Sequence, residues 1–238
     1  NVLPDGLFVD IVDTQYVHNQ AGMSGGMMQI NGSNLRFSVL NSKLKENTAS
    51  NGDGGCIFGR SDVTMDIQNT NIVSNQAGKN GGCMSFGDDT NVNISSSILD
   101  KNIANQSGGI MYMKTRSYMY LVKNTTITNN KAIYRDGGGF YNLAIYNIVS
   151  TTIHNNSARD NGGFLYVDMM YETKLRMIQS SFKNNIAKTK SGGVMIIHNV
   201  LPDGLFVDIV DTQYVQNQAG MSGGMMQKSM VLICAFQY

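Results

Sequence analysis

The chain has 238 residues, of which 42% are hydrophobic and only 15% charged, and its 18 basic and 17 acidic side chains leave a net charge of +1. This balance excludes a strongly basic nucleic-acid-binding protein and a polyacidic tail. Three cysteines exclude a dense disulfide framework. The 26 glycines with only two prolines favour a regular fold with many tight turns. No run reaches the roughly 20 apolar residues of a membrane-spanning helix, so we expect no membrane span in this segment.

A long and a short repeat run along the chain. Residues 1–29 recur at 199–227 with one difference, His18 against Gln216. We therefore interpret 1–198 as a block of seven coils, 199–227 as the start of a near-identical copy, and 228–238 as a divergent apolar tail or cap. Beneath this repeat, an Asn-x-Ala motif followed by Gly-Gly recurs about every 28 residues. The asparagines are Asn19, Asn47, Asn75, Asn102, Asn130, Asn156, Asn185 and Asn217, and the glycine pairs end at Gly26, Gly55, Gly82, Gly109, Gly139, Gly163, Gly193 and Gly224.

Aligning the units on this asparagine exposes further columns. A hydroxyl residue lies five positions before it in every unit, as Thr14, Ser42, Thr70, Ser97, Thr125, Thr151, Ser180 and Thr212. One apolar column holds Val9, Phe37, Met65, Val92, Tyr120, Tyr146, Leu175 and Val207, and the residues after the glycines are Met27, Cys56, Cys83, Ile110, Phe140, Phe164, Val194 and Met225. Apolar residues alternate with the period of two that is typical of strands.

These columns predict an all-β parallel β-helix in a single domain over 1–227. Each unit supplies about three short strands, and a 28-residue unit buries its apolar face only by stacking on its neighbours. We expect about eight coils. An inward asparagine at each bend can form a ladder of stacked amides. Gly-Gly provides either a positive φ or a close backbone approach at another corner.

One stretch carries a resemblance to known families. Phe182-Lys183-Asn184-Asn185-Ile186-Ala187, followed by Gly192-Gly193-Val194-Met195, resembles the FxxN and GGA[ILV] repeats of polymorphic outer-membrane proteins, which are bacterial surface adhesins. The columns also resemble the repeats of the pectin-lyase-like superfamily, which includes large surface proteins of protists. The resemblance implies a right-handed β-helix and a place on a cell surface.

Residues that occur once are the candidates for chemistry. Asp88-Asp89 could serve glycoside hydrolysis as a carboxylate pair, but adjacent acids in a polar connection are more often solvated. Arg135-Asp136 and Arg159-Asp160 lie in equivalent turns and favour a surface charge ladder. The three histidines, His18, His154 and His198, are scattered, and we expect no metal and no cofactor. Cys56 and Cys83, 27 residues apart, are interpreted as stacked thiols on neighbouring coils, with a disulfide as the alternative.

Two classes of function remain open. The first is a non-catalytic, extracellular structural or adhesive β-helix, a segment of a longer rod whose partners are other copies end to end or further coils of the same chain. Five Asn-x-Ser/Thr sequons support an extracellular glycoprotein, at Asn31, Asn93, Asn105, Asn124 and Asn155. The alternative is a carbohydrate-active or sugar-binding β-helix that recognises surface glycans, in which Tyr112, Tyr134 and Tyr166 stack on sugar rings.

Overall fold

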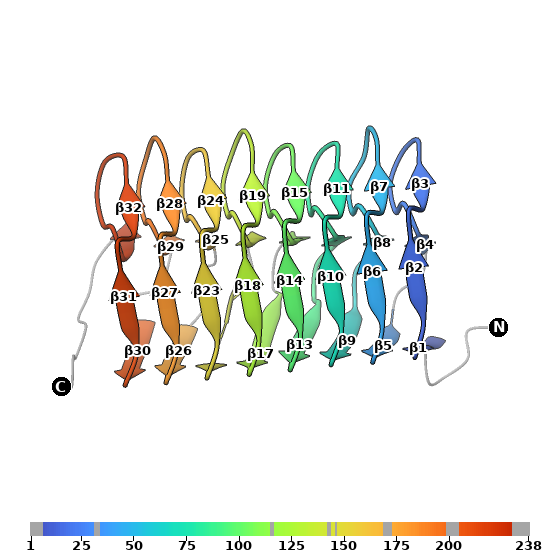
Figure 1. Cartoon of the computed structure of the whole chain (residues 1–238), viewed down its shortest axis with the longest axis horizontal. Coiled ribbons are helices and arrows are strands. Elements are labelled where there is room, and N and C mark those ends of the chain that lie inside the picture. Colours follow the sequence, from blue (N-terminus) through green and yellow to red (C-terminus); the bar gives the residue numbers. More distant parts are fainter. Residues whose placement is uncertain are drawn as a thin grey trace.

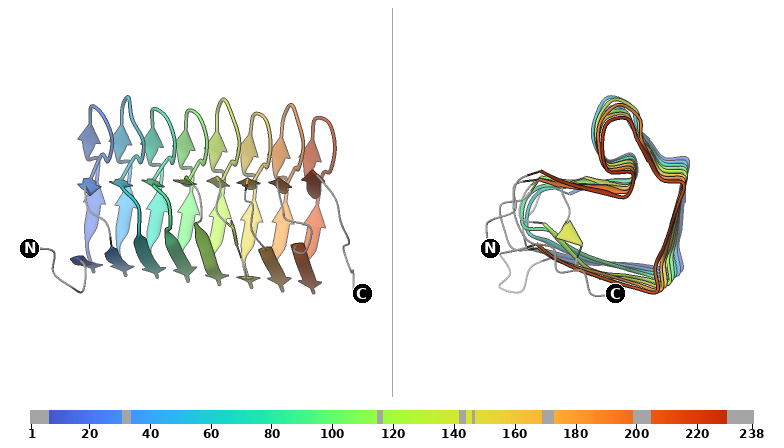
Figure 2. Two further views of the ribbon diagram at one scale, coloured as in Figure 1. Left: turned by 180° about the vertical axis from the view of Figure 1, so that it is seen from behind. Right: turned by 90° about the vertical axis from the view of Figure 1, so that its left-hand side faces the viewer.

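The computed structural model describes residues 7–30, 34–114, 117–141, 144–145, 147–168, 173–198 and 205–229. They form a right-handed parallel β-helix, so the predicted fold is confirmed (Figure 1). Viewed along the axis, the successive coils superimpose on one another (Figure 2). We number the coils 1 to 8 by their ladder asparagines, Asn19 to Asn217. No helix in this part of the chain is long and apolar enough to cross a membrane.

Each unit contributes four strands, whereas the sequence predicted about three. In coil 2 these are β5 (Leu35–Leu40), β6 (Lys43–Lys45), β7 (Thr48–Ala49) and β8 (Ile57–Gly59). The third strand has only two residues, which is too short to produce an alternating pattern in the sequence.

The four strands of a unit belong to four parallel sheets. The first sheet stacks β1 (Leu7–Val12), β5, β9 (Val63–Gln68), β13 (Asn91–Ser95), β17 (Tyr118–Lys123), β22 (Asn147–Val149), β26 (Thr173–Ile178) and β30 (Leu205–Val210), with β21 (Ala144–Ile145) also paired to β17. The second stacks β2 (Gln15–Val17), β6, β10 (Asn71–Val73), β14 (Ile98–Asp100), β18 (Thr126–Thr128), β23 (Thr152–His154), β27 (Ser181–Lys183) and β31 (Gln213–Val215).

The other two sheets follow the same order. The third stacks β3 (Gln20–Ala21), β7, β11 (Gln76–Ala77), β15 (Ile103–Ala104), β19 (Lys131–Ala132), β24 (Ser157–Ala158), β28 (Ile186–Ala187) and β32 (Gln218–Ala219). The fourth stacks β4 (Met28–Ile30), β8, β12 (Met84–Phe86), β16 (Met111–Met113), β20 (Phe140–Tyr141), β25 (Leu165–Asp168), β29 (Met195–His198) and β33 (Met226–Ser229). Strand β33 extends two residues into the segment predicted as a tail, and 230–238 lies outside the described residues.

The inward columns meet in register and form one core along the axis. Two assignments of the sequence were wrong. Val92 pairs with Met119, and a bulge then shifts the register, so that fully buried Met119 takes the place predicted for Tyr120. Tyr146, the next member of that predicted column, lies outside the described residues.

The second error concerns Gly137-Gly138-Gly139. The backbone of Ile110 donates to the carbonyl of Gly139, so Gly139 follows the glycine pair where Phe140 was predicted. Phe140 pairs instead with Met111 and Leu165. The ring of Phe164 from the next coil occupies the space beside Gly139.

Candidate functional site

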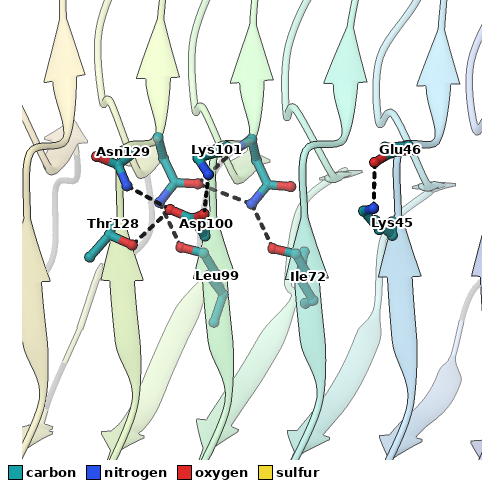
Figure 3. Close-up of polar contacts among 10 residues, drawn as sticks. Lys45, Glu46, Ile72, Leu99, Asp100, Lys101, Thr128 and Asn129 are labelled. Carbon is teal, nitrogen blue, oxygen red and sulfur yellow. Dashed lines mark hydrogen bonds and ion pairs between the residues drawn. The ribbon is translucent and has the colours of Figure 1, made fainter.

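The eight predicted ladder asparagines lie one above another at the bend between the second and third sheets. Each Nδ2 donates to the Oδ1 of the next asparagine, at 2.8–3.0 Å in all seven steps. The same Oδ1 also accepts the backbone N–H of the preceding asparagine. From Asn47 onward, the second hydrogen on Nδ2 is donated to a backbone carbonyl of the preceding coil. Asn102 donates in this way to Ile72 and Asn130 to Leu99, and Figure 3 labels these two acceptors.

This pattern uses the full hydrogen-bonding capacity of each interior amide. Two donors and two acceptor positions are all occupied, and Asn47 to Asn185 are completely buried. No buried side-chain nitrogen or oxygen lacks a partner within the described residues. The amides all point the same way along the axis, so the ladder has a direction.

A second ladder follows the hydroxyl column. All eight hydroxyls donate to the carbonyl two residues earlier, at 2.6–2.9 Å. Several also accept a backbone N–H from the preceding coil, as Thr70 accepts from Ser42. These bonds satisfy backbone groups at the bend between the first and second sheets.

A third ladder was missed by the sequence reasoning. It lies two residues before the second glycine of each pair, which is Gly138 in the unit with three glycines. It holds Ser24, Asp53, Asn80, Ser107, Asp136, Asn161, Ser191 and Ser222. Asn161 donates to Asp136 Oδ1 from both its backbone and its side chain, at 3.0 and 2.8 Å. The repeated short polar residue was the available signal. Burial raises the pKa of Asp136, and the bonds from Asn161 only partly oppose this.

The column just before the ladder asparagines has an unexpected backbone conformation. It holds His18, Glu46, Ser74, Lys101, Asn129, Asn155, Asn184 and Gln216, all with φ between 52° and 58°. The varied residue types identify it as an outward-facing column, but only the backbone shows the left-handed turn.

The two stacked cysteines are free and buried. The Sγ atoms of Cys56 and Cys83 lie 3.1 Å apart on neighbouring coils. Burial raises the pKa of the Cys83 thiol well above its ordinary value. Since the thiolate is the reactive form, the raised pKa makes Cys83 an unreactive packing group.

The candidate acids of the sequence are dispersed over the surface. Asp88 and Asp89 lie half-buried in the connection between β12 and β13. Asp160 pairs with Lys190 at 2.8 Å, whereas Asp136 bonds to Asn161. Among the described residues, no ion pair joins these two Arg-Asp turns to each other, although Asp160 does form an ion pair with the next coil, to Lys190. The described residues contain no group of three His, Cys, Asp or Glu side chains suited to a metal ion.

Tyrosines form a stack on the outer face of the fourth sheet. Tyr112 and Tyr141 lie 4.8 Å apart with nearly parallel rings, and Tyr141 and Tyr166 lie 4.9 Å apart. Tyr134 is 57% exposed elsewhere on the surface. Burial raises the pKa of Tyr141 to about 12, and the Tyr112 ring adds to this. The ring faces between these tyrosines are used by their neighbours and are not free for a ligand.

A surface cavity of about 500 Å³ opens next to this stack. Its lining includes Phe58, Tyr112, Asp53, Asn80, Arg60 and Lys114. Together with Phe86, the lining combines three aromatic rings with an acid, an amide and two cations, a composition that suits a polar ring-shaped ligand.

The two end faces of the rod differ from the interior. The ladder residues Asn19 and Asn217 are only half-buried, as are Tyr16 and Tyr214 beside them. Among the described strands, β1 pairs only with β5, and β30 only with β26. Within the part of the chain that the structure describes, both terminal coils therefore have strand edges without a neighbouring strand and core columns that no further coil covers.

The sequons differ in accessibility. Asn124 and Asn155 are exposed, whereas Asn93 and Asn105 are half-buried. Asn93 also donates to Asp66 Oδ1 at 2.8 Å. Asn31 lies outside the described residues. Of the four sequons that the structure describes, those at Asn124 and Asn155 are therefore the more accessible.

Comparisons of the chain with protein-family models, curated proteins and solved structures gave no match.

Proposed function

We propose that this chain is a non-catalytic structural or adhesive β-helix of a cell surface or extracellular space. The observation that carries the proposal is the asparagine ladder, in which each coil uses the same polar residues for the same bonds. Repetition of this kind supports a load-spreading or spacing role, whereas a catalytic site needs residues that occur once. The resemblance to polymorphic outer-membrane proteins and to protist surface proteins of the pectin-lyase-like superfamily supports the same proposal.

The location is tested by labelling intact source cells with an antibody against the purified chain. We expect labelling without permeabilisation. Expression through a eukaryotic secretory pathway, followed by glycosidase digestion, tests the sequons. A mobility shift that is lost in the Asn124→Gln, Asn155→Gln double variant is the expected result. Labelling only after permeabilisation would contradict the location.

A second candidate is sugar binding at the cavity beside the tyrosine stack. The aromatic rings of Phe58 and Tyr112 next to Asp53, Asn80 and Arg60 favour it. A polysaccharide panel separates the two candidates, because a binding or cleaving protein retains or degrades one polymer selectively. Loss of that retention in Tyr112→Ala, but not in Tyr134→Ala, would favour sugar binding over the structural role.

A further inference from the structure

Coils 1 and 8 have almost the same sequence, and between them they show each face of that sequence packed against a neighbouring coil. The described residues of coil 8 repeat those of coil 1 up to Gln227, apart from Gln216 in place of His18. In coil 1 the face toward the C-terminal end packs on coil 2, and in coil 8 the opposite face packs on coil 7. The free face of coil 8 therefore has the composition of a face that binds a coil, and so does the free face of coil 1.

The hydrogen-bonding groups at the two free faces are complementary. At the end of coil 8, Asn217 retains its backbone N–H and one Nδ2 hydrogen, because no asparagine follows it among the described residues. The carbonyl of Tyr214 lacks the amide donor that the equivalent Phe182 receives from Asn217. At the end of coil 1, Asn19 retains its Oδ1 and one Nδ2 hydrogen.

These groups match in number and direction. Stacking coil 1 of a second copy on coil 8 lets Asn19 Oδ1 accept both hydrogens of Asn217 and lets Asn19 Nδ2 donate to the Tyr214 carbonyl. This is the same three-bond set found at each interior step, for example between Asn102 and Asn130 with the Leu99 carbonyl. A head-to-head contact would instead place the two Asn19 acceptors against each other.

The apolar groups of the two faces also fit. Tyr214 stacks on Phe182 with ring centroids 5.0 Å apart and planes 5° from parallel. In a head-to-tail junction the opposite face of the Tyr214 ring would meet Tyr16, its counterpart in coil 1 of another copy. The half-buried Val9, Val207 and Ile209 would continue the core columns across the junction.

We propose that copies of this chain stack head to tail, with coil 1 of one copy on coil 8 of the next, into a polar filament. This inference rests on the proposed structural function and names its partner, a second copy of this chain. The junction is heterologous and does not close, so growth continues at both ends.

The second glycine of each pair offers a selective test. A Cβ at Gly193 would collide with the carbonyl oxygen of Gly224 in the next coil, whereas a Cβ at Gly224 approaches only its own coil's Asn217 carbonyl oxygen, at 2.8 Å. Gly224→Ala should therefore displace the Asn217 backbone within its own coil and, in addition, clash with Gly26 of an incoming copy. Light scattering of the wild-type chain should show mass that rises with concentration, and Gly224→Ala should remain monomeric. Val215→Lys, an exposed substitution on the side of coil 8, is the matched control and should assemble.

Because Gly224→Ala could shift the end coil, a second experiment tests polarity directly. Lys183 pairs with Val215 in the interior register, and Val17 occupies the same column in coil 1. In a background of Cys234→Ser, proteins carrying Val17→Cys or Val215→Cys are treated with a short bis-maleimide. The mixture should crosslink, and each protein alone should not.

The outcomes separate this proposal from the proposed function. Stable monomers at all concentrations, or crosslinking of Val215→Cys with itself, would overturn head-to-tail stacking. Neither result affects the structural role of a single rod, which surface labelling of source cells tests independently. Wild-type mass growth that Gly224→Ala leaves unchanged would also overturn the proposed junction.

Discussion

The side-chain amide of each interior ladder asparagine bonds to four groups of its neighbours, which makes it the residue on which the bend depends. Replacing Asn102 by leucine removes the acceptor of two bonds from Asn75 and the donors to the Ile72 carbonyl and to Asn130 Oδ1. An unsatisfied buried polar group costs about 1–3 kcal/mol. We therefore expect Asn102→Leu to lower the free energy of unfolding by at least about 3 kcal/mol in denaturant titrations.

The adjacent Lys101 provides the control for this substitution. Its side chain is exposed and makes only a long contact to Asp100, at 3.5 Å. Lys101→Leu should leave the free energy of unfolding within about 0.5 kcal/mol of the wild type. Equal losses for the two variants would contradict the special role of the inward amide.

The stacking of a residue can be predicted from the sequence where its column repeats one chemical type in every unit. Asparagine, the hydroxyls and Gly-Gly recur in eight units, so their stacking could be inferred without a structure. The left-handed conformation of the column just before the ladder asparagines, to which Lys101 belongs, could not be inferred, because side chains as different as His18, Glu46 and Ser74 share it. Their common property is the backbone φ, which leaves no signature in residue type when the side chain points to solvent.

That column predicts a stabilising substitution. Ser74 has a φ of 58°, a conformation that costs an L-residue roughly 1–2 kcal/mol and glycine almost nothing. Glycine loses about 0.5–1 kcal/mol through its unfolded-state entropy. We expect Ser74→Gly to stabilise by about 0.5–1 kcal/mol in thermal unfolding. Val73→Gly, one residue earlier in β10, should destabilise, and the same sign for both would contradict the prediction.

Asp136 predicts a pH-dependent effect. Burial raises the pKa of its carboxyl in the folded state, so the fold favours the protonated form. Its stabilising contribution is complete below the unfolded pKa of about 3.9 and is lost as the pH rises through the folded value. Asp136→Asn, the residue type of Asn80 and Asn161 in the same ladder, should raise the melting temperature at pH 7 more than at pH 3. A gain that is independent of pH would contradict this assignment.

Between elements, packing compensates for irregular units. The triple glycine leaves no side chain at Gly139, and the Phe164 ring of the next coil lies against it. This exchange of volume between coils is why aligning Phe140 with Ile110 by sequence was wrong. The residue pattern inside a unit identifies which positions point inward. Where a unit has an extra residue, such as the third glycine here, the alignment with the next unit depends on which side chains of the neighbouring coil fill the space.

The contact between Gly139 and Phe164 predicts that a substitution at one residue restores stability lost by a substitution at the other. Phe164→Ala should cost about 3–5 kcal/mol, because the fully buried ring leaves a cavity. Gly139→Val should be destabilising in the wild type, where its Cβ would meet the Phe164 ring at 2.9 Å. In the Phe164→Ala background, however, Gly139→Val should recover part of the loss, and the coupling is measured by a double-mutant cycle. Additive effects of the two substitutions would show that they do not share the space.

Over the whole molecule, stability depends on neighbours along one axis. Among the described strands, each coil pairs only with the coils before and after it, so interior coils have two such interfaces and coils 1 and 8 have one. The fold could be predicted from the sequence for the same reason, since one stacking rule repeats along the chain. End-to-end contacts were also expected from the sequence, whereas the particular amide and carbonyl groups at each end face could be identified only from the structure.

This arrangement predicts a gradient of amide hydrogen exchange. At low protein concentration, amides of coils 1 and 8 should exchange fastest and those of coils 4 and 5 slowest, because opening begins where one interface is missing. If copies stack head to tail, raising the concentration covers both end faces. Protection should then increase in the strands around Asn19 and Asn217 and remain unchanged around Asn102 and Asn130. Mass spectrometry of peptic fragments measures this directly. Equal protection of all coils at low concentration would mean that the rod opens as one cooperative unit rather than from its ends.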